Sequence, residues 1–188
     1  PSGRLNYSFP QSTGHLPCFY NYLPTDKGFY KQPGSAEKPG RDYVFASPAA
    51  LWPFGYGLSY TTFAYSNLRT DKEDYGVSDT IRVELDLSNE GSCWGKEVVQ
   101  VYVRDVVSSI VTPVRQLKAF SKIDLEAGTK RTVSLCIPVS ELGFYNRDME
   151  YTVEPGEFEL QIGASSEDIR LTKTITVDRR NMKHTLVQ

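Results

Sequence analysis

The chain has 188 residues, of which 39% are hydrophobic and 23% are charged, a composition typical of a globular protein. Its 21 Lys and Arg residues nearly balance 23 Asp and Glu residues, for a formal net charge of -2. Because both signs are interspersed, the charge gives no reason to expect nucleic acid or an anionic membrane as partner. No apolar run is long enough to span a membrane.

The three cysteines, Cys18, Cys93 and Cys136, cannot all be paired in disulfides, and no Cys-x-x-Cys spacing suggests zinc or redox chemistry. We therefore expect no metal and no cofactor.

Residues 1–57 are expected to form an extended arm and linker. Leu5, Tyr7 and Phe9 alternate with polar residues, which predicts a strand with one buried face; we expect its partner to lie in a separate, preceding domain. Residues 11–50 are rich in Pro, Gly and Tyr and keep no regular period. An irregular segment of this length is unusual inside a compact domain, so we expect it to lie over another domain or to reach toward a site.

The stretch 51–63, LWPFGYGLSYTTF, combines aromatic residues with two glycines and a proline. We call it the aromatic seam. Such a cluster of rings is too bulky to be left in water, so it predicts packing at a domain junction. The alternative is an aromatic platform for sugar rings. The candidate residues for either role are Trp52, Phe54, Tyr56 and Tyr60, together with Trp94 further along the chain.

Short apolar runs follow the seam, separated by turn residues such as those in Glu154-Pro155-Gly156-Glu157. They predict strands at 63–68, 81–88, 97–103, 114–125, 131–137, 150–153, 157–162 and 169–177, with one helical turn at 138–142. The strand at 97–103 is apolar on both faces and is therefore expected to be central. This pattern predicts an all-β immunoglobulin or fibronectin type III-like β-sandwich over residues 58–179, followed by a polar tail at 180–188.

The chain resembles the C-terminal part of family 3 glycoside hydrolases. The seam is similar to the signature that leads into the fibronectin type III-like domain of that family, and residues 89–103, 113–120 and 154–166 match further motifs in the same order. Residues 1–10 resemble the last strand of the family's preceding α/β sandwich domain. Trp52 stands where Tyr is usual, Trp94 where a small residue is common and Ala119 where Gly is usual.

The resemblance implies a parent enzyme that hydrolyses terminal β-glucosidic or β-xylosidic bonds with retention, which requires two carboxyl groups. In the family these groups lie in the upstream domains, so we assign no catalytic residue to this chain. We expect a noncatalytic structural module that packs against those upstream catalytic domains, in a periplasmic or secreted protein.

Two alternatives stay open for the module itself. It could be a carbohydrate-binding module whose rings stack on β-linked oligosaccharides, or its arm could border the active site of the parent with Tyr30 and Tyr43. Chemistry within this chain is disfavoured. The carboxylates at 71–74 and 167–168 fit solvated loop charges, and the two histidines, His15 and His184, lie in the arm and the tail.

Overall fold

The computed structural model describes residues 1–24, 47 and 49–178. Its strands are β1 (Phe63–Thr70), β2 (Asp74–Gly76), β3 (Thr80–Asn89), β4 (Gly95–Asp105), β5 (Gln116–Leu125), β6 (Lys130–Pro138), β7 (Phe144–Tyr145), β8 (Tyr151–Thr152), β9 (Gly156–Gly163) and β10 (Ile169–Asp178), and a short 3-10 helix, η2 (Val139–Leu142), follows β6.

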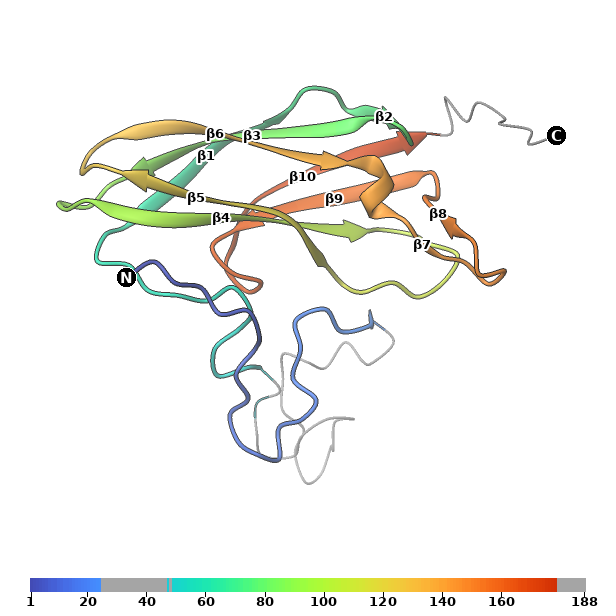
Figure 1. The fold of residues 1–188 in the computed structure, drawn as a ribbon, viewed down its shortest axis with the longest axis horizontal. Coiled ribbons are helices and arrows are strands. Elements are labelled where there is room, and N and C mark those ends of the chain that lie inside the picture. Colours follow the sequence, from blue (N-terminus) through green and yellow to red (C-terminus); the bar gives the residue numbers. More distant parts are fainter. Residues whose placement is uncertain (25–46, 48, 179–188) are drawn as a thin grey trace.

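Two sheets pack face to face as a β-sandwich (Figure 1). One sheet has the order β1-β3-β6, and the other has the order β2-β10-β9-β4-β5. The pairs are antiparallel except for β2, which runs parallel to β10. A small hairpin of β7 and β8 extends from one end of the sandwich. The predicted β-sandwich is therefore confirmed.

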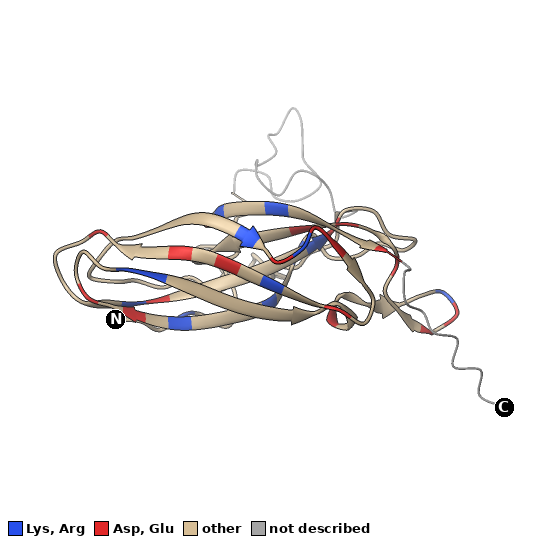
Figure 2. Ribbon diagram, turned by 90° about the horizontal axis from the view of Figure 1, so that it is seen from above, with Lys and Arg blue, Asp and Glu red and all other residues tan. Residues whose placement is uncertain are grey.

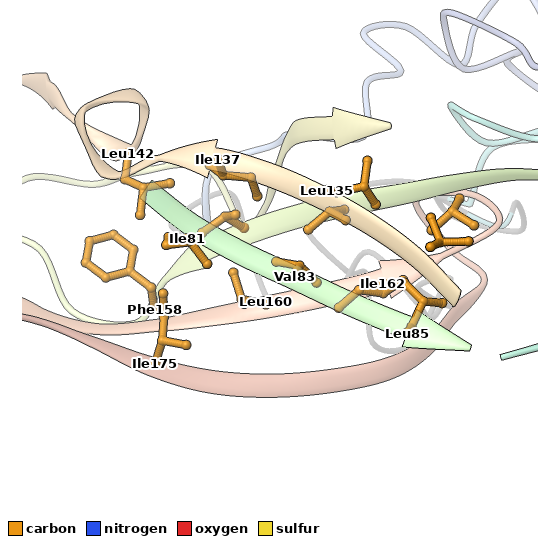
Figure 3. Close-up of a cluster of buried hydrophobic side chains, with 14 of the residues drawn as sticks. Ile81, Val83, Leu85, Leu135, Ile137, Leu142, Phe158, Leu160, Ile162 and Ile175 are labelled. Carbon is orange, nitrogen blue, oxygen red and sulfur yellow. The ribbon is translucent and has the colours of Figure 1, made fainter. Parts of the chain in front are cut away.

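The core follows from the alternation of side chains along the strands, because successive residues of a strand point to opposite faces. In β3, Ile81, Val83, Leu85 and Leu87 point inward and are 0% exposed. Figure 3 shows inward side chains from β3, β6, β9, β10 and η2 meeting between the two sheets. Charged residues of both signs are spread along the strands (Figure 2), as the balanced composition indicates.

Strand β4 is buried on both faces, as expected for a central strand. Val99 and Val101 belong to the core between the sheets. Gln100 and Tyr102 point to the outer face of the five-stranded sheet, and both are also buried, at 3% and 0% exposed. Their cover is the N-terminal part of the chain, which lies on this sheet (Figure 1).

Most predicted elements are confirmed, with boundaries shifted by a few residues. The helical turn forms as η2, and the strand expected at 150–153 is the second strand of the β7–β8 hairpin. The short strand β2 was not predicted.

The strand predicted near residues 4–9 is wrong, because in the structure only Phe9 forms an isolated bridge, with Trp52. The expected burial is reversed at two positions, since Ser8 is buried while Tyr7 is 52% exposed, whereas Leu5 and Phe9 are half-buried.

Candidate functional site

The arm and the first part of the aromatic seam lie side by side and form what we call the junction, residues 1–24 and 51–58. Four backbone hydrogen bonds join the two segments in an antiparallel manner. They run from Phe9 N to Trp52 O (2.8 Å), Leu51 N to Phe9 O (2.8 Å), Leu5 N to Tyr56 O (2.9 Å) and Gly55 N to Leu5 O (2.8 Å). Within this chain, the partner of the arm is therefore the seam.

Gln100 of β4 attaches the seam to the sheet. Its amide nitrogen donates to the carbonyl oxygens of Gly55 (3.1 Å) and Ala164 (2.6 Å), and its amide oxygen accepts from the Tyr102 hydroxyl at 2.6 Å. Gly55 has a φ of +80°, and a Cβ atom there would collide with the Gln100 side chain. Position 55 therefore requires glycine both for its backbone conformation and for this close approach.

Aromatic stacking continues the attachment. Tyr20 of the arm stacks on Phe54, with ring centroids 4.2 Å apart and planes at 19°, and meets Tyr102 edge-on at 5.8 Å. The Tyr20 hydroxyl accepts a hydrogen bond from the backbone nitrogen of Leu117 on β5 at 3.2 Å. Burial raises the pKa of Tyr102 above its usual value. The ring of Tyr20 thus holds the arm both to the seam, through Phe54, and to the sheet, through Tyr102.

A buried ion pair fixes the first residues of the arm. The Arg4 guanidinium donates from Nη2 to both carboxylate oxygens of Glu97, at 2.9 and 3.0 Å, and the two side chains are only 10% and 4% exposed. The Tyr65 hydroxyl donates to the same carboxylate at 3.1 Å. Burial, with the charge of Glu97 adding to it, raises the pKa of Tyr65 well above its usual value. The guanidinium of Arg170 lies 4.7 Å from the centre of the Tyr65 ring.

The predicted site residues separate into two groups. Trp52, Phe54 and Tyr56 lie in the junction, where Trp52 is 42% exposed and meets Phe9 edge-on at 5.3 Å. Tyr60 and Trp94 lie in neighbouring loops, because the Cys93 thiol contacts the Tyr60 carbonyl at 3.3 Å, and they are 85% and 51% exposed. The structure therefore does not bring all five rings into one platform. Tyr30 and Tyr43 lie outside the described residues.

Sequence reasoning missed three buried polar residues that hold this region together: Glu97, Gln100 and Asn89. Asn89, 1% exposed, donates to the carbonyls of Cys93 (2.9 Å) and Leu125 (3.1 Å) and accepts from the Thr61 hydroxyl of the seam at 2.5 Å. A polar residue inside a two-sided apolar strand was the available signal for Glu97 and Gln100, because such a residue needs a buried partner.

Loop carboxylates in the described part of the chain are engaged in local contacts. Asp71 accepts from the Tyr75 hydroxyl at 2.7 Å, and Asp168 pairs with Arg170 at 2.8 Å. Among the described residues, no group of three or more His, Cys, Asp and Glu side chains is placed to hold a metal ion. Within the same residues, no helix has the length and apolar character needed to cross a membrane.

Known proteins share this architecture and part of this sequence. A family model described as a fibronectin type III-like domain matches residues 97–166. A periplasmic β-glucosidase of Salmonella typhimurium is 38% identical over 90% of this chain and 22% of its own length. A β-xylosidase of Formosa agariphila is 36% identical over 94% of this chain and 23% of its own length.

Solved structures agree. The β-glucosidase of Listeria innocua in complex with glucose superposes with a TM-score of 0.77 at 38% identity, over 94% of this chain and 24% of that one. The chain thus spans less than a quarter of the length of these proteins. It is homologous to the C-terminal, fibronectin type III-like part of the β-glucosidases and β-xylosidases of glycoside hydrolase family 3, and belongs to that family.

Proposed function

We propose that the chain acts as a noncatalytic structural module of a larger retaining glycoside hydrolase, and that its junction docks onto the catalytic domains of that enzyme. The enzyme would hydrolyse terminal β-glucosidic or β-xylosidic bonds, as the names of its relatives suggest. The periplasmic location in the name of one relative supports a periplasmic or secreted setting. We further propose that residues 1–57 form the connecting arm, residues 58–179 the sandwich and residues 180–188 a tail.

The observation that carries the proposal is a row of exposed rings on a firmly held segment. Tyr7 lies 4.6 Å from Phe9, and Phe9 lies 5.3 Å from Trp52, measured between ring centres. Tyr7 and Trp52 are 52% and 42% exposed although the backbone beneath them is tied by hydrogen bonds. Large exposed apolar groups gathered on an ordered surface mark an interaction site.

Further apolar side chains of the junction are equally open: Leu16 is 65% exposed, Phe19 50% and Leu51 51%. A protein surface suits such a mixture of aliphatic and aromatic groups better than a sugar does, because a sugar platform needs rings with free, parallel faces. Trp52 instead packs at 78° to Phe9, and the Lys96 ammonium lies 5.4 Å from the centre of the Trp94 ring.

A chimera tests the docking. The homologous segment of the Listeria innocua β-glucosidase is replaced by this chain, and Tyr7→Ala/Trp52→Ala is compared with Phe120→Ala, which removes a ring that is 67% exposed on β5. We expect the double variant to lower the unfolding temperature of the chimera more than that of the isolated chain, because it removes about 2 kcal/mol or more of apolar contact between domains. Phe120→Ala is expected to act equally in both settings. An equal effect of the double variant in both settings would contradict docking.

Sugar binding is separated from docking by a titration of the chain with cellobiose and xylobiose, followed by amide chemical shifts. The structural proposal expects no saturable shifts near Trp52, Tyr60 or Trp94 at millimolar sugar. Saturable shifts there would instead support a carbohydrate-binding module.

A further inference from the structure

A second feature, separate from the junction, lies at the end of the sandwich near η2. A partly open cavity of about 150 Å³ lies there between the end of β4, residues 110–113 with the beginning of β5, and the η2–β7 segment. Its inner wall is apolar and includes Val103, Leu142 and Phe158. Figure 3 shows Leu142 and Phe158 at the same end of the core. The cavity therefore extends the core toward the surface at this end.

One carboxylate on the cavity wall lacks a full set of partners. Asp105, the last residue of β4, lines the cavity, and its Oδ2 atom is buried without a hydrogen-bond partner. Burial raises the pKa of Asp105 to about 6, opposed by a hydrogen bond from the Val107 amide and reinforced by the charge of Glu154. The group is thus mainly ionised at neutral pH, and a buried carboxylate with an unsatisfied oxygen favours a donor, above all a cationic one.

Among the described residues, no charged group donates to Asp105 Oδ2, although Arg104 and Arg147 line a second cavity that Asp105 shares. The Lys118 ammonium also lines the cavity, but it donates to the backbone carbonyl of Glu141 on η2 at 2.6 Å. Glu154 adds negative charge, and its own carboxylate is held by the Ser109 backbone nitrogen at 2.8 Å and by the Ser109 hydroxyl. Asp105 is therefore the carboxylate of this cavity that has an oxygen without a donor among the described residues.

The outer wall adds aromatic groups. Phe144 and Tyr145 of β7 both line the cavity, and Tyr145 is 60% exposed. The ring of Tyr145 is held at an angle of 69° to that of Tyr151 on β8, with centres 5.4 Å apart. Aromatic rings attract organic cations through their π-electron faces, and more strongly where water is excluded.

We propose that this cavity binds an organic ammonium group carried on a short apolar stem. The ammonium donates to Asp105 Oδ2, the stem packs against Val103 and Phe158, and the rings of β7 close the site. Such a group is found at the end of lysine side chains, and amino sugars carry the same ammonium on a polar ring instead of an apolar stem. A neutral hydroxyl compound fills the same volume but leaves the buried charge uncompensated.

The test uses the whole chain and amide chemical shifts at pH 7.5, with n-butylamine against n-butanol as the neutral isostere. We expect saturable shifts at Val107, Phe144 and Tyr145 with the amine, and at least tenfold weaker binding of the alcohol. Asp105→Asn should bind the amine at least tenfold more weakly, whereas Asp124→Asn, a matched change at an exposed position of β5, should bind it with unchanged affinity. Equal binding of amine and alcohol, or unchanged binding to Asp105→Asn, overturns the proposal.

Two further probes distinguish the sources. Stronger binding of an acetylated lysine amide than of glucosamine assigns the site to a polypeptide partner, and the reverse order assigns it to an amino sugar. Glucose serves as the neutral control for glucosamine, and glucose binding as strongly as glucosamine would contradict the role of the charge. A thermal unfolding curve of Asp105→Asn at the same pH verifies that lost binding does not reflect an unfolded variant.

Discussion

The ion pair between Arg4 and Glu97 is the contact of the junction whose removal has the most definite consequence. Arg4→Met leaves the carboxylate of Glu97, which is 4% exposed, with the Tyr65 hydroxyl as its one hydrogen-bonding side chain among the described residues and with the more distant charge of Arg170 as partial compensation. Removing one member of a buried pair costs about 3–5 kcal/mol, because the remaining charge is desolvated and uncompensated. A cavity of about 310 Å³ beside the pair is lined by both residues and gives water a route to the carboxylate. We therefore expect the lower end, about 3 kcal/mol.

The assay is urea unfolding followed by circular dichroism, with thermal unfolding as a second measure. For a chain of this length, 3 kcal/mol corresponds to a decrease of about 6–12 °C in Tm. The matched control is Arg69→Met, because Arg69 pairs with Glu84 at the same distance, 2.9 Å, but is 48% exposed. An exposed pair of this kind contributes about 0–1 kcal/mol.

The double variant Arg4→Met/Glu97→Leu separates charge from packing. Since it leaves no buried charge behind, it should be more stable than Arg4→Met alone. The reasoning is refuted if Arg4→Met costs no more than Arg69→Met, or if the double variant is no more stable than Arg4→Met alone.

Three further predictions concern other parts of the molecule. Gly55→Ala should lower the free energy of unfolding in urea by about 3 kcal/mol, because the cost of a positive φ adds to that of a collision with Gln100. The control Gly128→Ala should lower it by only about 1 kcal/mol, because Gly128 has a φ of +69° but no described atom within 4 Å of an added Cβ. Similar costs would contradict the close approach at Gly55. Asn89→Ala should cost about 3 kcal/mol, since it leaves two carbonyls, one hydroxyl and the backbone N–H of Gly91 without their side-chain partner, and a loss below 1 kcal/mol would argue against that role. Because burial raises the pKa of Asp105 to about 6, above its unfolded value, the contribution of Asp105 to stability falls as pH rises from about 4 to about 6. Asp105→Asn should match wild type near pH 4 and exceed it by about 1 kcal/mol at pH 7.5, and a difference independent of pH would count against this.

The strands were predictable wherever one face is buried and the other is solvated. β3 is the clearest case, because Ile81, Val83, Leu85 and Leu87 point inward and the residues between them are polar; the last inward residue, Asn89, is the exception. β4 was correctly expected to be central, but the sequence does not show that its outer face is covered by the arm of the same chain. That cover depends on Tyr20 and Phe54, which lie more than 45 residues before Tyr102.

The arm was mispredicted for a physical reason. Alternation identifies two faces of a segment, but the choice of the buried face depends on the partner, and here the partner is the seam about 45 residues away. Arg4 and Ser8 are covered because Glu97 and the backbone of Phe54 provide polar partners for them. Tyr7, the residue expected inside, is therefore left on the surface. Buried polar pairing between distant segments is the information that local patterns lack.

The most direct test of the structural role is hydrogen–deuterium exchange of the chain alone and of the same chain within the Listeria innocua chimera. Docking predicts that residues 5–24 and 49–58 gain protection in the chimera, while β6, on the opposite sheet, exchanges equally in both. Equal exchange of the arm and seam in the two settings would contradict a junction that packs against catalytic domains.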